Sequence, residues 1–268
     1  MISINIDPVL ISFFGFEIRY YGLVYVLGFL LGLYTLNKAR KDGILNLEKD
    51  QVYDLMFYLM LGVIIGARLF HAIFWDFSYF LKEPWKILYL WQGGMSFHGG
   101  LFGILLSGYI YCKKKNINAK KLADVLTLPA VFALALGRIV NFINQEIVGT
   151  VTNVSWCFKF KNYEECRHPV QLYAAFGRFL AFFILLKFWN KHKEGFIFWN
   201  FILFFGIGRF FLDFIREDLI YLGLKAGQWF SLIMIIVSGY ILFKFYMEDV
   251  KKVFSFKKDN AKKNQENT

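Results

Sequence analysis

The sequence predicts an all-α polytopic membrane protein, with a single transmembrane domain over residues 1–268 that contains seven helices. Three observations support this fold class. The 268-residue chain is 57% hydrophobic and 21% aromatic, with a mean hydropathy of +0.44, which is more apolar than a typical soluble domain. Its apolar residues lie in long runs, and a helix needs about 20 such residues to cross a bilayer. Its basic residues gather in alternate loops between these runs.

The seven predicted spans are runs of mainly apolar residues separated by polar or charged loops. They fall near residues 20–37, 52–75, 95–112, 122–142, 170–189, 196–215 and 226–247. Small residues at four-residue spacing allow transmembrane helices to approach closely. Three such pairs predict close helix packing: Gly62 with Gly66, Gly99 with Gly103, and Ala133 with Gly137.

The distribution of positive charge predicts the orientation of the chain. The loops near 38–50, 113–121 and 187–194 and the tail from 244 hold 19 of the 31 lysines and arginines, whereas the opposite loops hold seven. The positive-inside rule therefore places the N-terminus outside and the C-terminus in the cytoplasm. The net charge of +11 is explained by topology and by a basic tail, about 248–268, beside anionic lipid. We expect no nucleic-acid partner.

Two outer segments are more than simple loops. Residues 75–94 are rich in amphipathic aromatic side chains, which favour the headgroup region, and they predict an interfacial arm. Residues 143–169 predict a small extracytoplasmic head. Cys157 and Cys166 share this head, so a disulfide between them is sterically possible, and the spacing alone leaves the question open.

Polar side chains from four different spans fall in the outer half of the membrane. Tyr21 stands at the outer start of the first span, and His98 at the outer mouth of the third. Arg138 lies in the outer third of the fourth span, and Arg209 lies just past the midplane of the sixth. An arginine inside a membrane costs about 3 kcal/mol or more. We therefore expect a compensating anion, such as a lipid phosphate, at this level.

The two arginines have a functional and a structural interpretation. Guanidinium groups suit a phosphate because they offer a planar fork of donors. Internal ion pairing is the alternative, since Asp213 follows Arg209 by four residues and Glu146 lies near Arg138. Both roles are compatible, because the acids can orient the arginines.

His98 lies between two pairs of glycines, in Gly93-Gly94-Met95-Ser96-Phe97-His98-Gly99-Gly100. A histidine at a water-accessible mouth can act as a general base near neutral pH. The alternative is a packed histidine hydrogen-bonded to a carbonyl group.

For Arg68 and His71, three residues apart on the second span, we expect a structural role. Arg19 and Arg178, near span ends or faces, can reach the interface with long side chains, so we assign them no chemistry.

With these residues in place, the chain resembles the bacterial phosphatidylglycerol–prolipoprotein diacylglyceryl transferase family over essentially every span. The 137–149 run Gly-Arg-Ile-Val-Asn-Phe-Ile-Asn-Gln-Glu-Ile-Val-Gly is the most specific feature, and His98 in its glycine frame is the second. The other matching motifs are Arg19-Tyr20-Tyr21-Gly22, Arg167-His168-Pro169 with Gln171-Leu172-Tyr173, Arg209 with Asp213, and Gly227-Gln228.

The resemblance implies a multi-pass enzyme of the bacterial plasma membrane, with its site facing the outer leaflet. Such an enzyme transfers the sn-1,2-diacylglyceryl group of phosphatidylglycerol to the thiol of the lipobox cysteine of a preprolipoprotein and releases glycerol-1-phosphate. It implies no metal and no organic cofactor. The catalytic residues expected from the match and from the residues' chemistry are His98, Arg138 and Arg209, and the substrate-binding residues are Arg138, Tyr21, Asn141, Glu146, Gly149 and Asp213.

The sequence departs from the family's usual pattern at a few positions near these residues. Val140 stands where Gly or Ala is usual, Asp213 replaces Glu, and Phe205 replaces Tyr; Val170 and Ala174 replace Ser and Glu. None of them removes the arginines or the histidine. An anionic-phospholipid transporter or flippase is the alternative, but it would need polar groups in the inner halves of the spans, where ionisable residues are few. A non-enzymatic lipid-binding membrane protein is also compatible with the residue placement.

Overall fold

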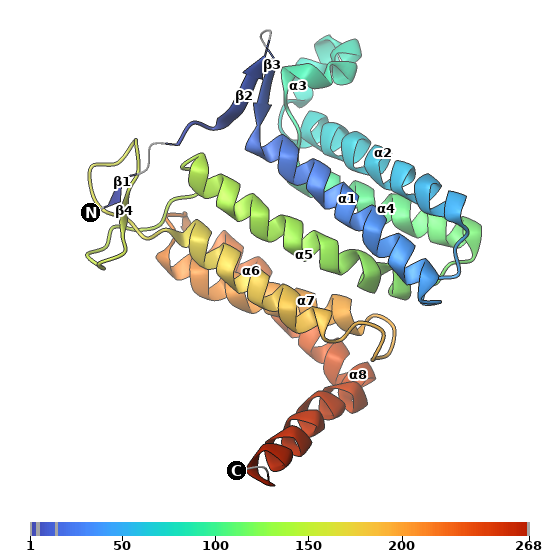
Figure 1. Ribbon diagram of the computed structural model, residues 1–268. Coiled ribbons are helices and arrows are strands. Elements are labelled where there is room, and N and C mark those ends of the chain that lie inside the picture. The colour runs from blue at the N-terminus through green and yellow to red at the C-terminus, as the bar shows by residue number, and fades with distance from the viewer. Residues whose placement is uncertain (1, 4–5, 14–15, 267–268) are drawn as a thin grey trace. The chain divides into compact units, whose positions relative to one another are not determined.

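The computed structural model describes residues 2–3, 6–13 and 16–266, and helices dominate it (Figure 1). Within this described part, five helices are long and apolar enough to cross a membrane. They are α1 (Tyr20–Lys41), α2 (Lys49–Phe74), α5 (Ala119–Ile143), α7 (Phe196–Leu212) with its 3₁₀ extension η3 (Asp213–Ile215), and α8 (Ala226–Glu266) as far as Val253. A multi-helix membrane architecture is confirmed at this level.

Two further predicted spans form helices that are shorter or less apolar. α6 (Val170–Leu186) has 17 residues. α4 (Phe97–Lys115) contains four glycines and ends in three lysines, which lower its hydropathy. α8 extends beyond the predicted span and bends at Tyr246, whose φ of −131° and ψ of 15° are not helical. The predicted basic tail of 248–268 continues this helix to Glu266, and residues 267–268 lie outside the described residues.

The chain forms two compact units. Residues 1–31 and 123–268 make up the first unit, and residues 32–122 make up the second. The long helix α1 belongs to the first unit as far as Leu31 and to the second unit from Gly32 onward.

In the second unit, α2 and α4 pack through their glycines. A Cβ atom on Gly62 or Gly66 of α2 would collide with the α4 backbone, and one on Gly99 or Gly103 of α4 would collide with the α2 backbone. Close backbone approach through small residues is therefore the reason for this spacing, as predicted.

The segment that follows α2 is held by one arginine. It consists of α3 (Phe77–Lys82) and two 3₁₀ helices, η1 (Pro84–Leu88) and η2 (Leu90–Gln92). Arg68, which is only 5% exposed, donates hydrogen bonds to carbonyl oxygens of this segment and of the two glycines that follow it, over 2.5–3.2 Å. The acceptors are Lys86, Ile87, Tyr89, Gly93 and Gly94. The structural role expected of Arg68 is confirmed.

In the first unit, an apolar core joins α5, α6 and α7. Leu128 and Val131 of α5 pack with Leu185 of α6 and Ile197 of α7, all at most 4% exposed. The start of α7 is capped from α5, since the Asp124 carboxylate accepts hydrogen bonds from the backbone N–H groups of Gly195 at 2.7 Å and Phe198 at 2.8 Å. These contacts fix the three helices against one another.

The small residues of α5 behave differently from one another. A Cβ on Gly28 of α1 would lie 3.2 Å from Ala133 Cβ, so these helices meet closely there. A Cβ on Gly137 would meet nothing within 4 Å. Ala133 therefore joins a helix interface as predicted, whereas the close packing predicted at Gly137 is wrong, because no atom lies within 4 Å of a Cβ placed there.

Short strands complete the first unit. β1 (Ile2–Ser3) pairs in parallel with β4 (Phe158–Lys159), β2 (Val9–Phe13) pairs antiparallel with β3 (Phe16–Arg19), and β5 (Ile220–Tyr221) pairs antiparallel with β6 (Leu224–Lys225). Cys157 and Cys166 form a disulfide with a Cα–Cα distance of 5.6 Å. The question that their spacing left open is thus answered in favour of the bond.

Candidate active site

A cavity of about 100 Å³ lies within the first unit, among side chains of α5, α6 and α7 and the segments that follow them. Among the residues that the structure describes, the lining is mostly apolar or small, and its charged members are four arginines and one aspartate. These are Arg138 of α5, Arg178 of α6, Arg209 of α7, and Asp213 and Arg216 just beyond α7. The two arginines that the sequence singled out therefore share one cavity, together with two that it did not.

The carboxylate of Asp213 lies between two of these guanidinium groups. Its Oδ2 is 3.5 Å from Arg209 Nε, and its Oδ1 is 3.5 Å from Arg216 Nη1. Asp213 is 1% exposed, so the ion pairs are shielded from solvent at the carboxylate end. The ion pairing considered for Asp213 is present, and Arg209 still keeps 39% of its side-chain surface exposed.

A glycine of α8 makes room for this ion pair. A Cβ on Gly227 would collide with Asp213 Oδ2 and would lie 3.0 Å from Arg209 Nη2. Gln228, the next residue, is 2% exposed, accepts a hydrogen bond from the Lys225 backbone N–H at 3.0 Å and donates one to the Phe210 carbonyl at 3.3 Å. These contacts give the Gly227-Gln228 motif a structural reason.

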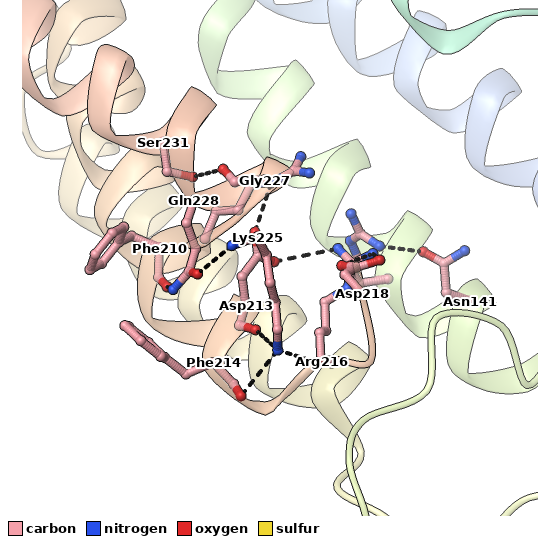
Figure 2. Close-up of polar contacts among 12 residues, drawn as sticks. Asn141, Phe210, Asp213, Phe214, Arg216, Asp218, Lys225, Gly227, Gln228 and Ser231 are labelled. Atoms are coloured by element: carbon pink, nitrogen blue, oxygen red, sulfur yellow. Dashed lines mark hydrogen bonds and ion pairs between the residues drawn. The ribbon is translucent and has the colours of Figure 1, made fainter. Parts of the chain in front are cut away.

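Lys225 closes the end of α7. Its ammonium group donates hydrogen bonds to the carbonyl oxygens of Asp213 at 2.6 Å, Phe214 at 3.2 Å and Arg216 (Figure 2). The last carbonyl groups of a helix have no partner within the helix, and a cation there is favourable. Lys225 thus fixes the backbone from which Asp213 and Arg216 project.

Arg138 belongs to a polar network at the end of α5. Its Nη1 donates to Asn141 Oδ1 at 3.1 Å. The Asn141 amide in turn donates to Glu146 Oε2 at 2.8 Å and to the Tyr21 hydroxyl, and the Tyr21 hydroxyl donates to Glu146 Oε2 at 2.5 Å. The structure therefore brings together four of the predicted residues from α1, α5 and the following loop. Glu146 acts on Arg138 through Asn141 rather than by a direct ion pair.

Gly149 is required by close packing. A Cβ there would lie 2.5 Å from the His168 carbonyl oxygen and 2.8 Å from Val170 Cγ1. The Gly149 backbone N–H donates to that carbonyl at 3.2 Å, and Arg167 Nη1 donates to the Gly149 carbonyl at 3.0 Å. This glycine joins the loop after α5 to the start of α6, which places two walls of the cavity.

His98 lies in the second unit, as the second residue of α4. Ser96 is the N-cap of this helix: its hydroxyl accepts a hydrogen bond from the Gly99 N–H at 3.4 Å, and its own N–H donates to the Ala67 carbonyl at 3.0 Å. Gly93 and Gly94 have φ values of +81° and +75°, which non-glycine residues rarely adopt. The imidazole is exposed and its ring centroid lies 5.8 Å from that of Phe97.

The sequence did not single out Arg178 and Arg216 as members of the cavity. Arg178 was assigned to a span face, yet it lines the cavity from α6 and donates to the Leu134 carbonyl at 3.3 Å. Arg216 lies three residues after Asp213, and this spacing is the sequence signal that indicates their ion pair. Four guanidinium groups and one carboxylate give the described lining residues a net formal charge of +3, so the electrostatic field of the cavity favours an anion.

Comparison with known proteins identifies the family. A family model described as prolipoprotein diacylglyceryl transferase matches residues 8–244. A protein of Geobacter sulfurreducens named phosphatidylglycerol–prolipoprotein diacylglyceryl transferase is 41% identical over 228 residues, which cover 84% of this chain and 88% of that protein. A protein of Vibrio cholerae with the same name is 39% identical, over 87% of this chain and 89% of that protein. One of Aeromonas hydrophila, also with this name, is 37% identical, over 90% of this chain and 91% of that protein.

Proposed function

Because the chain belongs to the prolipoprotein diacylglyceryl transferase family, we propose that it catalyses the transfer named by its relatives. It takes the sn-1,2-diacylglyceryl group from phosphatidylglycerol and attaches it through a thioether to the lipobox cysteine of a preprolipoprotein. The second product is glycerol-1-phosphate. The observation that carries this proposal is the cavity in which Arg138 and Arg209 lie together with an excess of positive charge.

Phosphate binding is the role of the two arginines. Arg138 is oriented by Asn141, and Arg209 is oriented by Asp213. With one edge of each guanidinium fixed, the remaining N–H groups are available for phosphate oxygens that enter the cavity. Charge develops on the departing phosphate as the reaction proceeds, so donors already in place stabilise the transition state.

The reaction exchanges one bond at carbon for another. The cysteine sulfur forms a bond to the third glycerol carbon of the diacylglyceryl group, and the bond between that carbon and the phosphate oxygen breaks. The thiol proton passes to His98, directly or through a water, and finally to the leaving phosphate, which departs as glycerol-1-phosphate. No oxidant or reductant is needed, and the residues require no metal or organic cofactor.

The remaining residues position the headgroup. Asn141 and Glu146 hydrogen-bond the headgroup glycerol or hold Arg138, and Tyr21 lies against the lipid near its glycerol backbone. Gly149 keeps the loop and α6 close enough to shape the cavity. The bonds among Tyr21, Asn141 and Glu146 support this assignment, because they already tie the three side chains into one network.

The membrane arrangement follows from the same proposal. With α4 and α6 added to the five long apolar helices, the chain crosses a bacterial plasma membrane seven times, so its termini lie on opposite sides. The positive-inside rule places the N-terminus outside and the C-terminus in the cytoplasm. Residues 143–169 then form an extracytoplasmic head, and residues 75–94 form an interfacial arm. Exposed tryptophans at 75, 85 and 91 support the arm, because tryptophan favours the headgroup region. The family membership favours transfer over the transporter and scaffold alternatives.

A peptide assay tests the proposal. The purified full-length protein is reconstituted with phosphatidylglycerol and a synthetic peptide that carries a lipobox cysteine, and the peptide mass is measured. We expect an added diacylglyceryl mass and an equimolar release of glycerol phosphate. A serine in place of the peptide cysteine, and phosphatidylethanolamine in place of phosphatidylglycerol, serve as negative controls.

Unchanged peptide mass under these conditions would contradict the transferase assignment. Movement of labelled phosphatidylglycerol between leaflets without peptide modification would favour the flippase instead. The variant Arg19→Gln is a matched control for arginine removal, because this exposed arginine pairs only with Glu17 among the described residues and lies outside the cavity. It is expected to transfer at the wild-type rate.

A further inference from the structure

Arg178 is an arginine of the cavity for which the reaction above has no use. It lies on the apolar helix α6, eight residues after the helix starts at Val170. Its guanidinium carbon stands 5.2 Å from the centroid of the Phe205 ring, and Nη1 donates to the Leu134 carbonyl at 3.3 Å. Among the described residues, no carboxylate lies within ion-pair distance of Arg178. An arginine kept at such a place in a membrane helix needs a partner.

Along the axis of α5, the guanidinium group of Arg178 lies nearer the start of the helix than that of Arg138. Leu134, its hydrogen-bond acceptor, precedes Arg138 on α5 by four residues, or about 6 Å along the helix axis. Arg138 reaches the other way, toward Asn141 near the end of α5. The cavity therefore presents guanidinium groups at two levels about a helical turn or more apart.

The space beside these groups is open. A Cβ on Gly177 of α6 or on Gly208 of α7 would meet no atom within 4 Å, and both glycines line the cavity. Ala174 and Ala181 extend the same small-residue face of α6 above and below Arg178. The protein's own side chains thus leave a slot along this arginine that a ligand can fill.

The level of Arg178 suits an uncharged acceptor. A diacyl phospholipid carries one phosphate, and its two ester carbonyl groups lie below that phosphate at the top of the acyl chains. With the phosphate at Arg138 and Arg209, these carbonyls come to the level of Arg178. A guanidinium offers several N–H donors and no acceptor, so ester carbonyl oxygens match it while hydrocarbon chains do not.

We propose that Arg178 binds an acyl ester carbonyl of the donor lipid and thereby makes the enzyme selective for diester over diether phospholipids. This inference rests on the proposed function for the phosphate position. Arg178 is a substrate-binding residue in this account and takes no part in bond exchange.

The test crosses two enzymes with two lipids. Wild type and Arg178→Met are assayed with dioleoyl phosphatidylglycerol and with its dioleyl diether analogue, which keeps the phosphate and the chains but lacks the carbonyls. In wild type we expect a KM about tenfold lower for the diester, with similar kcat, since about 1.4 kcal/mol of binding corresponds to this ratio. Arg178→Met should remove the preference by raising the KM of the diester alone. Arg178→Lys should retain part of it, because an ammonium group can still donate.

Several results would overturn the inference. One is equal use of the two lipids by wild type. Another is an unchanged lipid preference in Arg178→Met. A third is an equal loss of activity with both lipids in Arg178→Met, which would indicate a structural or phosphate-binding role. If Arg178→Met does not fold, the wild-type ratio and Arg178→Lys decide. Binding of both lipids to the purified protein, measured by native mass spectrometry, gives the same ratio without catalysis. Selective binding without peptide modification would refute the proposed transfer step, whereas the binding of an ester carbonyl by Arg178, which depends only on the phosphate position, would stand.

Discussion

Asp213 has an unusual position at the scale of single residues. Among the described residues that line the cavity it is the one carboxylate, and four guanidinium groups share that lining. Its oxygens reach Arg209 and Arg216 at 3.5 Å, and its backbone carbonyl accepts from Lys225. An aspartate so placed neutralises part of the charge and orients two arginines. It leaves enough positive charge for a ligand phosphate.

The shape of the Arg209 side chain should matter as much as its charge. Arg209→Lys keeps one positive charge but loses the fork that spans Asp213 on one side and the phosphate on the other. We expect kcat/KM of peptide modification to fall about 10- to 100-fold, the range for losing one or two charge-assisted hydrogen bonds. A lysine variant with wild-type kcat/KM would show that Arg209 acts only as a point charge.

Gly227 should tolerate no side chain. In Gly227→Ala the new methyl group would collide with the Asp213 carboxylate and press on Arg209. We expect the free energy of unfolding to fall by about 1–3 kcal/mol, which lowers the melting temperature. We also expect a lower rate of diacylglyceryl transfer. Gly137→Ala is the matched control, because its methyl group would meet nothing within 4 Å and alanine favours a helix. Equal melting temperatures for the two variants would contradict the close approach at Gly227.

At the scale of elements, α6 and α7 present glycines to the cavity for a reason opposite to that in α2 and α4. In α2 and α4 the missing side chains let two backbones touch. At Gly177 and Gly208 the missing side chains leave room that no protein atom fills. The same residue type thus serves packing in one unit and ligand space in the other.

Filling the cavity should block the donor lipid without unfolding the protein. Gly208→Leu adds a side chain where a Cβ meets no atom, so we expect normal folding and at least tenfold slower peptide modification, with weaker binding of phosphatidylglycerol. Gly239→Leu on α8 is the matched control, because that position is equally open and does not line the cavity. Full activity of Gly208→Leu, measured beside the control, would mean that lipid does not enter at this place.

The sequence predicted the elements better than their contacts. Long apolar runs predicted α1 and α7 with boundaries close to those observed, since such runs depend on local composition. The membership of Arg178 and Arg216 in the cavity could not be predicted, because it depends on how α6 and α7 are rotated against α5. The close packing predicted at Gly137 was wrong because the distance to a neighbouring helix at that level is also set by tertiary packing. Motif spacing did suggest Asp213 with Arg209, since residues four apart share a helix face.

At the scale of the whole molecule, the two compact units divide the proposed chemistry. The arginines and their orienting residues belong to residues 1–31 and 123–268, whereas His98 belongs to residues 32–122. The long helix α1 is shared by both units.

The orientation of the chain can be measured with C-terminal fusions. With the C-terminus in the cytoplasm, a green fluorescent protein fused after Thr268 should fluoresce, and alkaline phosphatase at the same place should be inactive. The positive-inside distribution of lysine and arginine is the physical reason. The reverse pattern would overturn the assignment of the cavity to the outer leaflet.

The central claim is that Arg138 and Arg209 hold a single phosphate, and a double-mutant cycle on phosphatidylglycerol affinity tests it most directly. Native mass spectrometry gives Kd for wild type, Arg138→Ala, Arg209→Ala and the double variant. If both arginines bind one headgroup, each single variant should lose most of the affinity, and the double variant should be little worse. This result corresponds to a coupling energy of about 1 kcal/mol or more. Losses that add to within about 0.5 kcal/mol would show that the two arginines act independently, and would contradict the account.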